Sequence, residues 1–404
     1  MNEKTLRLLN DAKGHNTTQN RNSIRFYLRY TLRIIQGPVV TNSTFMDIMH
    51  SLYRAAKPLI FKLSPDNAHA VFLFMGEIMG SNPLTRALIA SLYEYHGADI
   101  SKTVNGVTYQ TPVLLSAGFD SDGRLTRILR HLSFGGEEIG SITAYPCEGN
   151  PLPRMTRLIR NKSMIVYKGL RNNGVDALIT RLKKTPHTPG FVIGISIART
   201  NRKESCTNTE EGINDFALSF QKLNDANIGD YYTINISCPN AFAGEAFTSP
   251  EPLTKLLTRL ETIPCTKPIY LKMPIHLPTP EFDALLRIAD KFRIHGVICG
   301  NLNKNYNELD FPEDAPKEFR GGLSGKPCFL RSNALIRYTR EHFGDRFTII
   351  GTGGILSPED AMEKFRSGAD IVQMISGMIF TSPSLMKQIC KKYAEERPMF
   401  LPKK

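Results

Sequence analysis

The stretch 347–377, FTIIGTGGILSPEDAMEKFRSGADIVQMISG, contains two apolar runs separated by one segment of helical periodicity. The runs FTIIGTGG (347–354) and IVQMISG (371–377) both end in small residues. Between them, PEDAMEKFRSG (358–368) has the apolar spacing of an amphipathic helix. A strand, a helix and a second strand in this order are typical of a β/α/β unit with parallel strands. The stretch therefore predicts one repeat of an α/β fold.

Similar apolar runs recur along the chain from residue 112 onward. Segments with helical periodicity, for example 283–292, lie between them. Eight strand-like runs, each followed by such a segment, predict a (β/α)8 TIM barrel, in which the parallel strands are buried on both faces. The eight runs are 112–119, 137–142, 191–198, 231–238, 268–274, 296–301, 347–354 and 371–377.

The first hundred residues have a different pattern, with helical segments predicted over 44–63, 67–80 and 84–94. They are followed by Asn105-Gly106, which is a strong signal for a β-hairpin with a type I′ turn. The chain is therefore expected to carry a helical extension in front of the barrel. The expected parts are a basic tail with an amphipathic helix (1–40), the helical extension (41–100) and the barrel (101–396).

Charge is distributed unevenly along the 404 residues: the formal net charge is +13, and residues 1–57 hold nine Lys and Arg against three Asp and Glu. Arg25, Arg29 and Arg33 are spaced four apart among apolar residues, which predicts a basic amphipathic helix over 23–37. Such a helix can lie on an anionic membrane surface, or it can be a solvated face packed on its own domain. No uncharged apolar run approaches the ~20 residues that span a bilayer, so no transmembrane helix is expected.

The seven cysteines include no CxxC pair. This argues against a disulfide framework and against a zinc or iron–sulfur site, so no metal is expected. Cys238 stands out because the run TINIS (233–237) delivers it to the end of a predicted strand, between Asn235 and Asn240. A lone cysteine at such a place is either a buried structural residue or a functional one, and the residues at the other strand ends decide between the two.

The carboxyl ends of the strands are where chemistry gathers in barrels of this kind. Here they carry mostly small residues and single polar groups. The turns GGLSGK (321–326), GTGG (351–354) and ISG (375–377) follow the last three strands, and they predict a cup that binds a phosphate through backbone N–H groups. A single cup and the absence of a GxGxxG fingerprint indicate FMN rather than a dinucleotide. Lys272, at another strand end, would stabilise the anionic reduced flavin ring.

Four motifs together resemble those of the dihydroorotate dehydrogenases, particularly the membrane-associated, quinone-reducing class 2. The resemblance covers about residues 45–395, and its motifs are SAGFDSDG (116–123), EGNPLPRMTRL (148–158), NISCPN (235–240) and RGGLSGKP (320–327). It implies an FMN-bound barrel that oxidises dihydroorotate to orotate in de novo pyrimidine (UMP) biosynthesis. It also implies that the extension forms a tunnel for ubiquinone or menaquinone. The expected location is peripheral, at the cytoplasmic face of the cell membrane in a bacterium or at the inner mitochondrial membrane in a eukaryote.

The resemblance also implies roles for individual residues. Cys238 falls on the catalytic base, which removes a C5 proton of dihydroorotate while C6 passes a hydride to flavin N5. Class 2 usually has serine there, and a thiol, with an ordinary pKa of about 8.5, is expected to be the better base. Arg157 matches an arginine at the quinone end of the tunnel, and Asn235, Asn240 and Asn301 match amides that bind the pyrimidine ring. The implied flavin contacts are Ala117, Gly118, Ser121, Ser141, Ser196, Asn235, Lys272, Gly300, Gly325, Gly353, Gly354, Ile375, Ser376 and Gly377.

The chain departs from the family pattern at several positions. The family's lysine in AGFDK, which contacts both substrate and flavin, is Ser121 here, and the NRxGFN substrate loop is VYKGLRN (166–172). A substrate carboxylate left without a cation in a water-poor site would be costly. We therefore hypothesise that Lys168 or Arg171, on the altered loop, supplies the missing cation. The other departures are Val166, Leu170, Ser196, Leu302 and Ile375.

Two alternatives to this function remain open. One is an FMN oxidoreductase of the same fold acting on another dihydropyrimidine or an enone, and the other is a catalytically silent FMN-binding barrel. The joint presence of Asn235, Cys238, Asn240, Lys272 and Asn301 disfavours the silent barrel. Nucleic-acid binding, which a pI of 9.4 suggests, is disfavoured because the basic residues concentrate in the predicted amphipathic helix without interleaved stacking aromatics.

Overall fold

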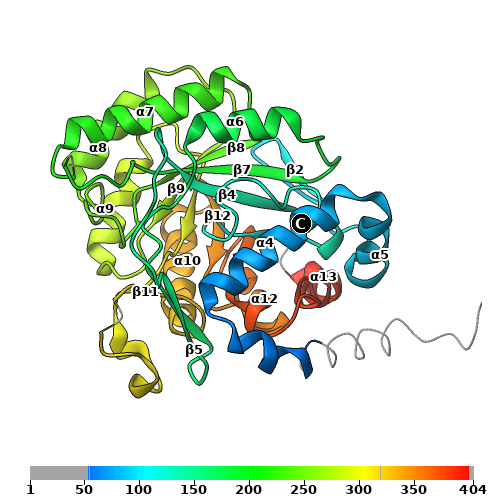
Figure 1. The fold of residues 1–404 in the computed structure, drawn as a ribbon. Coiled ribbons are helices and arrows are strands. Elements are labelled where there is room, and N and C mark those ends of the chain that lie inside the picture. The colour runs from blue at the N-terminus through cyan, green and yellow to red at the C-terminus, as the bar shows by residue number, and fades with distance from the viewer. Residues whose placement is uncertain (1–52, 54, 205, 319, 400–404) are drawn as a thin grey trace, which may run out of the picture. The chain divides into compact units, whose positions relative to one another are not determined.

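Eight parallel strands close into a barrel (Figure 1). The computed structural model describes residues 53, 55–204, 206–318 and 320–399, and the predicted tail and amphipathic helix lie outside them. Each barrel strand overlaps one of the eight predicted runs, which confirms the (β/α)8 barrel. In chain order the barrel strands are β3 (Val113–Leu115), β4 (Gly136–Ile142), β7 (Val192–Ile197), β8 (Tyr231–Asn235), β9 (Ile269–Met273), β10 (Gly296–Cys299), β12 (Thr348–Thr352) and β13 (Ile371–Met374).

Helices cover the outside of the barrel and bury one apolar stripe each, as α11 does with Met362 and Phe365. This helix begins at a capping box, in which the N–H of Asp360 donates to Ser357 Oγ at 3.2 Å and the N–H of Ser357 donates to the Asp360 carboxylate at 2.8 Å. The barrel helices are α6 (Val175–Lys184), α7 (Thr209–Asp225), α8 (Pro250–Glu261), α9 (Thr279–Ala289), α10 (Phe329–Phe343), α11 (Pro358–Arg366), α12 (Ser376–Phe380) and α13 (Leu385–Glu396). Short 3-10 helices are η1 (Leu129–Leu132), η2 (Tyr306–Glu308), η3 (Pro312–Asp314), η4 (Lys326–Cys328) and η5 (Arg397–Met399).

The first repeat of the barrel differs from the prediction. Between β3 and β4 the chain forms only η1, so the prediction of a helix after the first strand is wrong. The extension helices α4 (Pro65–Ser81) and α5 (Pro83–Tyr93) supply the outer layer there. Leu73 and Ile89 pack in the same hydrophobic cluster as Leu125 and Ile128, which precede η1. The surface that a barrel helix would cover is therefore already buried by the extension.

A three-stranded antiparallel sheet was not predicted. It consists of β5 (Met155–Leu158), β6 (Ser163–Val166) and β11 (Gly322–Leu323), in the order β11-β6-β5. These strands belong to the connections that follow β4 and β10, so the sheet stands at the carboxyl end of the barrel. It adds a wall to that end, since Met155, Met164 and Val166 line the cavity described below.

The amino end of the barrel is sealed by the predicted hairpin, β1 (Lys102–Val104) and β2 (Val107–Tyr109). Asn105 and Gly106 have φ of 48° and 78°, the left-handed pair that a type I′ turn requires, so this prediction is confirmed. Asn105 Nδ2 donates to Tyr270 OH at 3.2 Å and to Thr348 Oγ1 at 2.9 Å. Tyr109 is fully buried in the same cluster as Tyr270. The amino end is therefore filled by side chains, and a ligand site is expected at the opposite, carboxyl end.

The extension is tied to that carboxyl end. Its described part comprises the helical residues 55–62 together with α4 and α5, which fall on the predicted segments 67–80 and 84–94. Arg157 on β5 donates to the carbonyl of Leu63 at 2.7 Å, and Lys57 Nζ donates to the carbonyl of Phe380 on α12 at 2.6 Å. Among the described helices, none combines the length and the apolar character needed to cross a bilayer.

Candidate active site

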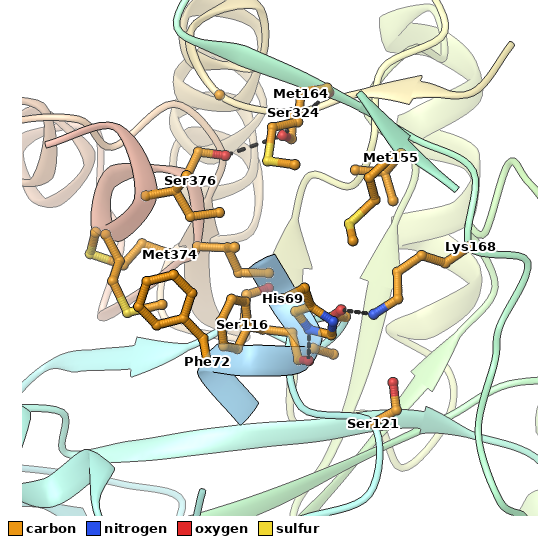
Figure 2. A pocket seen from close by; sticks show the side chains of 18 of the residues that line it. His69, Phe72, Ser116, Ser121, Met155, Met164, Lys168, Ser324, Met374 and Ser376 are labelled. Carbon is orange, nitrogen blue, oxygen red and sulfur yellow. Dashed lines mark hydrogen bonds between the residues drawn. The ribbon is translucent and has the colours of Figure 1, made fainter. Parts of the chain in front are cut away.

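A cavity of about 470 Å³ opens at the carboxyl end of the barrel strands. Its walls come from the strand ends, from the three-stranded sheet and from the extension helices (Figure 2). Most residues predicted from the strand ends and from the family motifs meet here. Those that line the cavity are Ala117, Gly118, Ser121, Ser141, Arg157, Lys168, Arg171, Asn235, Cys238, Asn240, Lys272, Gly300, Asn301, Gly325, Gly353, Gly354, Ile375 and Ser376.

Two predicted flavin contacts, Ser196 and Gly377, do not line the cavity. Ser196 is fully buried, and its Oγ lies 2.8 Å from Ser141 Oγ, so it supports a cavity residue from behind. A Cβ on Gly377 would lie 2.3 Å from the carbonyl oxygen of Ile355, so a glycine is needed there for packing. Both residues shape the rim without facing the cavity.

The glycine turns bring bare backbone to the cavity surface. Gly353 and Gly354 have φ of 97° and 77°. A Cβ on them would lie 2.9 Å from the Cβ of Cys328 and 2.5 Å from the Cβ of Phe329. Gly118 also has a positive φ, of 109°, but a Cβ there would meet no heavy atom within 4 Å, so it would occupy open space. A side chain at Gly118 would fill room that a bound molecule can use.

Two of the three predicted amides, Asn235 and Asn301, form one hydrogen-bonded group with Ser141 and Ser237. Asn235 Nδ2 donates to Ser141 Oγ at 2.7 Å, and Asn235 Oδ1 accepts from Asn301 Nδ2 at 3.3 Å. Asn301 Nδ2 also donates to Ser237 Oγ at 2.8 Å. Asn240 Nδ2 donates to a backbone carbonyl, but its buried Oδ1 has no hydrogen-bond partner in the part of the chain that the structure describes. A buried acceptor of this kind suits a ligand that brings an N–H group.

Lys272 is a buried cation with a carboxylate inside the barrel beneath it. Its Nζ lies 3.7 Å from Glu138 Oε1, and the two side chains are 5% and 0% exposed. Glu138 is held from below, since its Oε2 accepts from Thr233 Oγ1 at 3.0 Å and from Gln373 Nε2 at 2.9 Å. The pair offsets the cost of burying each charge and holds the ammonium group at the cavity floor.

A second cation, Lys168, comes from the altered loop. Its Nζ donates to the carbonyl of Gly118 at 2.8 Å. Burial, and after it the charge of Arg171, lower the pKa of Lys168 to about 8. In Figure 2 Lys168 and Ser121 both point into the cavity. The altered loop therefore brings an ammonium group to the same space as the serine that replaces the family's lysine.

Cys238 lines the cavity, but its electrostatics differ from the prediction. Burial, with a smaller contribution from the carboxylate of Glu245, raises the pKa of the thiol to about 11. The backbone N–H groups of Asn240 and Ala241 and the charge of Lys272 act in the opposite direction without compensating. The pKa of this thiol therefore lies above the ordinary value of about 8.5 on which the comparison with serine was based, because desolvation of the thiolate outweighs the nearby positive charge. The resting thiol keeps its proton at neutral pH.

The extension contributes cavity residues that sequence reasoning missed. His69, Phe72, Met75 and Met79 on α4 line the cavity. His69 Nε2 lies 2.6 Å from the carbonyl oxygen of Phe119, and burial lowers the pKa of His69 to about 3, so the ring is neutral. The richness of this segment in Met and Phe was visible in the sequence, but its inward direction depends on how α4 packs on the barrel.

Arg157 stands where the extension meets β5. Its guanidinium lies 4.6 Å from the centre of the Phe61 ring, and burial lowers the pKa of Arg157. Its Nε is buried without a hydrogen-bond partner among residues 53–399 as described. This end of the cavity therefore combines apolar walls with one unsatisfied cationic donor.

Comparison with known proteins agrees with this geometry. The family model for dihydroorotate dehydrogenase matches residues 99–396. The chain belongs to the dihydroorotate dehydrogenase family. Dihydroorotate dehydrogenase (quinone) of Christiangramia forsetii is 34% identical over 345 residues, covering 84% of this chain and 98% of the relative. The enzyme of the same name from a Synechococcus strain is 32% identical, covering 86% and 93%.

Solved structures of the family share the fold. Dihydroorotate dehydrogenase from Eimeria tenella in complex with ferulenol superposes with a TM-score of 0.72 at 22% identity, covering 83% of this chain and 95% of that structure. Members of the dihydroorotate dehydrogenase family depend on a flavin. The open space at Gly118, the unpartnered Oδ1 of Asn240 and the buried Lys272 all fit a planar, hydrogen-bonding ring of this type.

Gly118→Ala tests the flavin site. The methyl group would project into the cavity, so we expect flavin affinity to fall at least ~10-fold, measured as flavin absorbance retained after gel filtration. Gly106→Ala is the matched control, because it also has a positive φ with open space around it but lies in the hairpin at the other end of the barrel. Both variants should lose a similar ~1–2 kcal/mol of stability. Equal flavin retention in the two variants would contradict the assignment.

Proposed function

We propose that this chain binds FMN, oxidises dihydroorotate to orotate and passes the electrons to a membrane quinone. The observation that carries the proposal is that one cavity is lined by the three amides, Cys238 and two lysines, by the glycine turns and by apolar residues of the extension helices. A site for a polar planar substrate, a phosphate and an apolar electron acceptor needs these three regions in contact.

FMN is the flavin that suits the cavity best. The backbone at Gly325, Gly353 and Gly354 and the hydroxyl of Ser376, which lies 3.1 Å from Ser324 Oγ, would hold its phosphate. Gly118 and Lys272 would lie against its ring. When bound, the flavin supplies a hydride acceptor and a store for two electrons. The glycine turns form a single site for one phosphate. FMN carries one phosphate, so this favours a mononucleotide over a dinucleotide.

The substrate would be held by amides and one cation. Asn235, Asn240 and Asn301 offer donors and acceptors to the ring, including the unpartnered Oδ1 of Asn240. Lys168 is positively charged below about pH 8 and offers its ammonium group to the substrate carboxylate. This supports the hypothesis that Lys168 supplies the cation that is missing at Ser121. Arg171 adds positive charge from the same loop. Cys238 would take the C5 proton, provided that the proton already on its sulfur has somewhere to go.

The electron acceptor would enter along the extension. Arg157 offers its unpartnered Nε–H to a quinone oxygen, and Phe61, Phe72, Met75 and Met79 offer apolar walls. The outer surface of the extension is also apolar, which supports a peripheral position on a membrane. Its exposed large apolar residues are Leu59, Leu63, Val71, Phe72, Phe74, Met75, Ile78, Leu84 and Leu88.

Anaerobic addition of dihydroorotate to the yellow protein should bleach the flavin, and a short-chain quinone should restore the colour. Cys238→Ala should retain flavin but bleach about 10²- to 10⁴-fold more slowly, because the proton acceptor at C5 is lost. Cys265→Ala, a half-buried cysteine beyond α8, is the control and should bleach at the normal rate. If dihydroorotate at any concentration fails to bleach the flavin of the wild-type protein, the proposed function is contradicted. Normal bleaching by Cys238→Ala would contradict only the role of the thiol.

Lys168→Ala should raise KM for dihydroorotate about 10- to 100-fold, because a charge-assisted hydrogen bond to the substrate carboxylate is lost. Adding Ser121→Lys to this variant should recover affinity by restoring a cation from the other side. In the wild type, KM should rise as the pH passes above about 8, where Lys168 loses its charge. Lys183→Ala, exposed on α6, serves as the control. An unchanged KM in both Lys168→Ala and Arg171→Ala would exclude compensation by this loop.

Phe74→Glu and Leu88→Glu should each reduce binding to anionic phospholipid vesicles about tenfold, since at least ~1.5 kcal/mol of apolar burial is lost per side chain. Vesicle co-sedimentation of the full chain measures this. Leu330→Glu on α10 is the matched control, because Leu330 is 77% exposed but lies outside the extension. Equal binding of all three variants would show that the extension surface does not face the membrane.

A further inference from the structure

Lys364 on α11 is a fully buried cation that belongs to no part of the site described above. Its side chain is 0% exposed. Its ammonium group donates to Asn333 Oδ1 at 2.9 Å and to Ser332 Oγ at 3.1 Å, both on α10. It also lies 5.2 Å from the centre of the Phe329 ring. These three partners are uncharged, so they solvate the buried positive charge without neutralising it.

No carboxylate among the described residues forms an ion pair with Lys364. Asp360 and Glu363 on the same helix act on it at longer range, but each is engaged elsewhere. The Asp360 carboxylate accepts the N–H of Ser357 in the capping box, and Glu363 pairs with Arg366. A buried ammonium group without a counter-ion destabilises the folded chain, so an anion is expected close to it.

The titratable groups around Lys364 come from η4, β10 and α11. Burial is the largest influence and lowers the pKa of Lys364 to about 7. The thiols of Cys328 and Cys299 and the carboxylates of Asp360 and Glu363 act in the opposite direction without compensating. An anion held beside Lys364 would raise this pKa and keep the ammonium group charged.

Ser332 connects Lys364 to the glycine-lined rim of the cavity. The Ser332 hydroxyl, which accepts from Lys364, donates to the carbonyl of Thr352 at 2.6 Å. Thr352 and Gly353 both line the cavity. Their peptide bond is trans, so the N–H of Gly353 points in the opposite direction from the Thr352 carbonyl. The peptide therefore turns its acceptor end toward Lys364 and its donor end away from it, as an anion site on the cavity side requires.

The glycine turns themselves bring no charged side chain to the cavity. The turns 321–326, 351–354 and 375–377 contain one charged residue, Lys326. Lys326 pairs with Asp310 and does not line the cavity. A phosphate in this cup carries nearly two negative charges at neutral pH. Lys364 brings a cation directly behind the turn 351–354, since a Cβ on Gly351 would lie 3.2 Å from Lys364 Cδ.

We propose that Lys364 positions the phosphate of FMN from behind the glycine-lined rim: its ammonium group orients the Thr352–Gly353 peptide through Ser332 and is the counter-charge of the phosphate. This inference rests on the proposed binding of FMN. Lys364 does not line the cavity, so it acts through this peptide and through its electric field. Because it acts on the phosphate, it favours FMN over riboflavin, which has the same ring system and no phosphate.

The test compares the affinities of the two flavins. The full chain, stripped of flavin, is titrated with FMN and with riboflavin, and quenching of flavin fluorescence gives each Kd. Lys364→Met removes the charge and should weaken FMN binding at least ~10-fold with riboflavin binding unchanged, because only the phosphate loses its counter-charge. Lys387→Met is the matched control, because Lys387 is also a buried lysine, on α13, and donates to the carbonyl of Leu92. It should keep the wild-type preference for FMN.

Two results of this titration would overturn the role of Lys364. One is a wild-type preference for FMN in Lys364→Met, and the other is an equal loss of affinity for both flavins, which would show that the lysine only supports packing. If the wild-type protein binds neither flavin, the proposed function fails. If the wild type binds FMN and Lys364→Met keeps its preference, only the role of Lys364 fails.

A second measurement uses the wild-type protein alone and decides the question even if Lys364→Met does not fold. At pH 8 Lys364 is mostly uncharged before binding, and a phosphate beside it should raise its pKa. FMN binding should therefore take up more protons than riboflavin binding, by up to about one per chain. Calorimetry in two buffers of different ionisation enthalpy measures this difference. Equal proton uptake with the two flavins would overturn the proposal.

Discussion

Closure of eight parallel strands is the constraint on which the site depends, because it turns the carboxyl end of every strand toward one rim. Cys238 after β8, Lys272 on β9 and Asn301 after β10 come from distant parts of the sequence and meet for this reason. The hairpin with Tyr109 fills the opposite end, so water has no access to the barrel interior from there. Glu138 can then be satisfied only by interior donors and by the ammonium group above it.

Burial accounts for both of the unusual ionisations at the rim. The pKa of Lys168 falls and that of Cys238 rises, and in each case desolvation is the main cause. The cavity therefore disfavours any isolated charge, whatever its sign. Bringing an anionic substrate beside Lys168 would reverse the first shift. A charge in this cavity is therefore stable when a group of opposite charge lies beside it, as Glu138 lies beside Lys272.

Much of this architecture was predictable because it is encoded locally. Most barrel strands are largely apolar runs, and Asn105-Gly106 specifies its turn through backbone preference alone. The sheet β5–β6–β11 was missed because β11 has two residues and pairs with a strand more than 150 residues away. Local sequence also cannot distinguish Ser196, one layer behind the cavity, from Ser141 on its surface. The pKa of Cys238 depends on burial, which no motif records.

The short helix α12 has a consequence for how the two ends of the site communicate. Ser376, at its start, belongs to the glycine-lined rim, and the carbonyl of Phe380, at its end, is held by Lys57 of the extension. The five residues of α12 thus separate the glycine-lined rim from the extension. The extension is therefore part of the structural support of the cavity. Removing the extension would release the carbonyl of Phe380 from Lys57 and so free the end of a helix whose first residue lines the cavity.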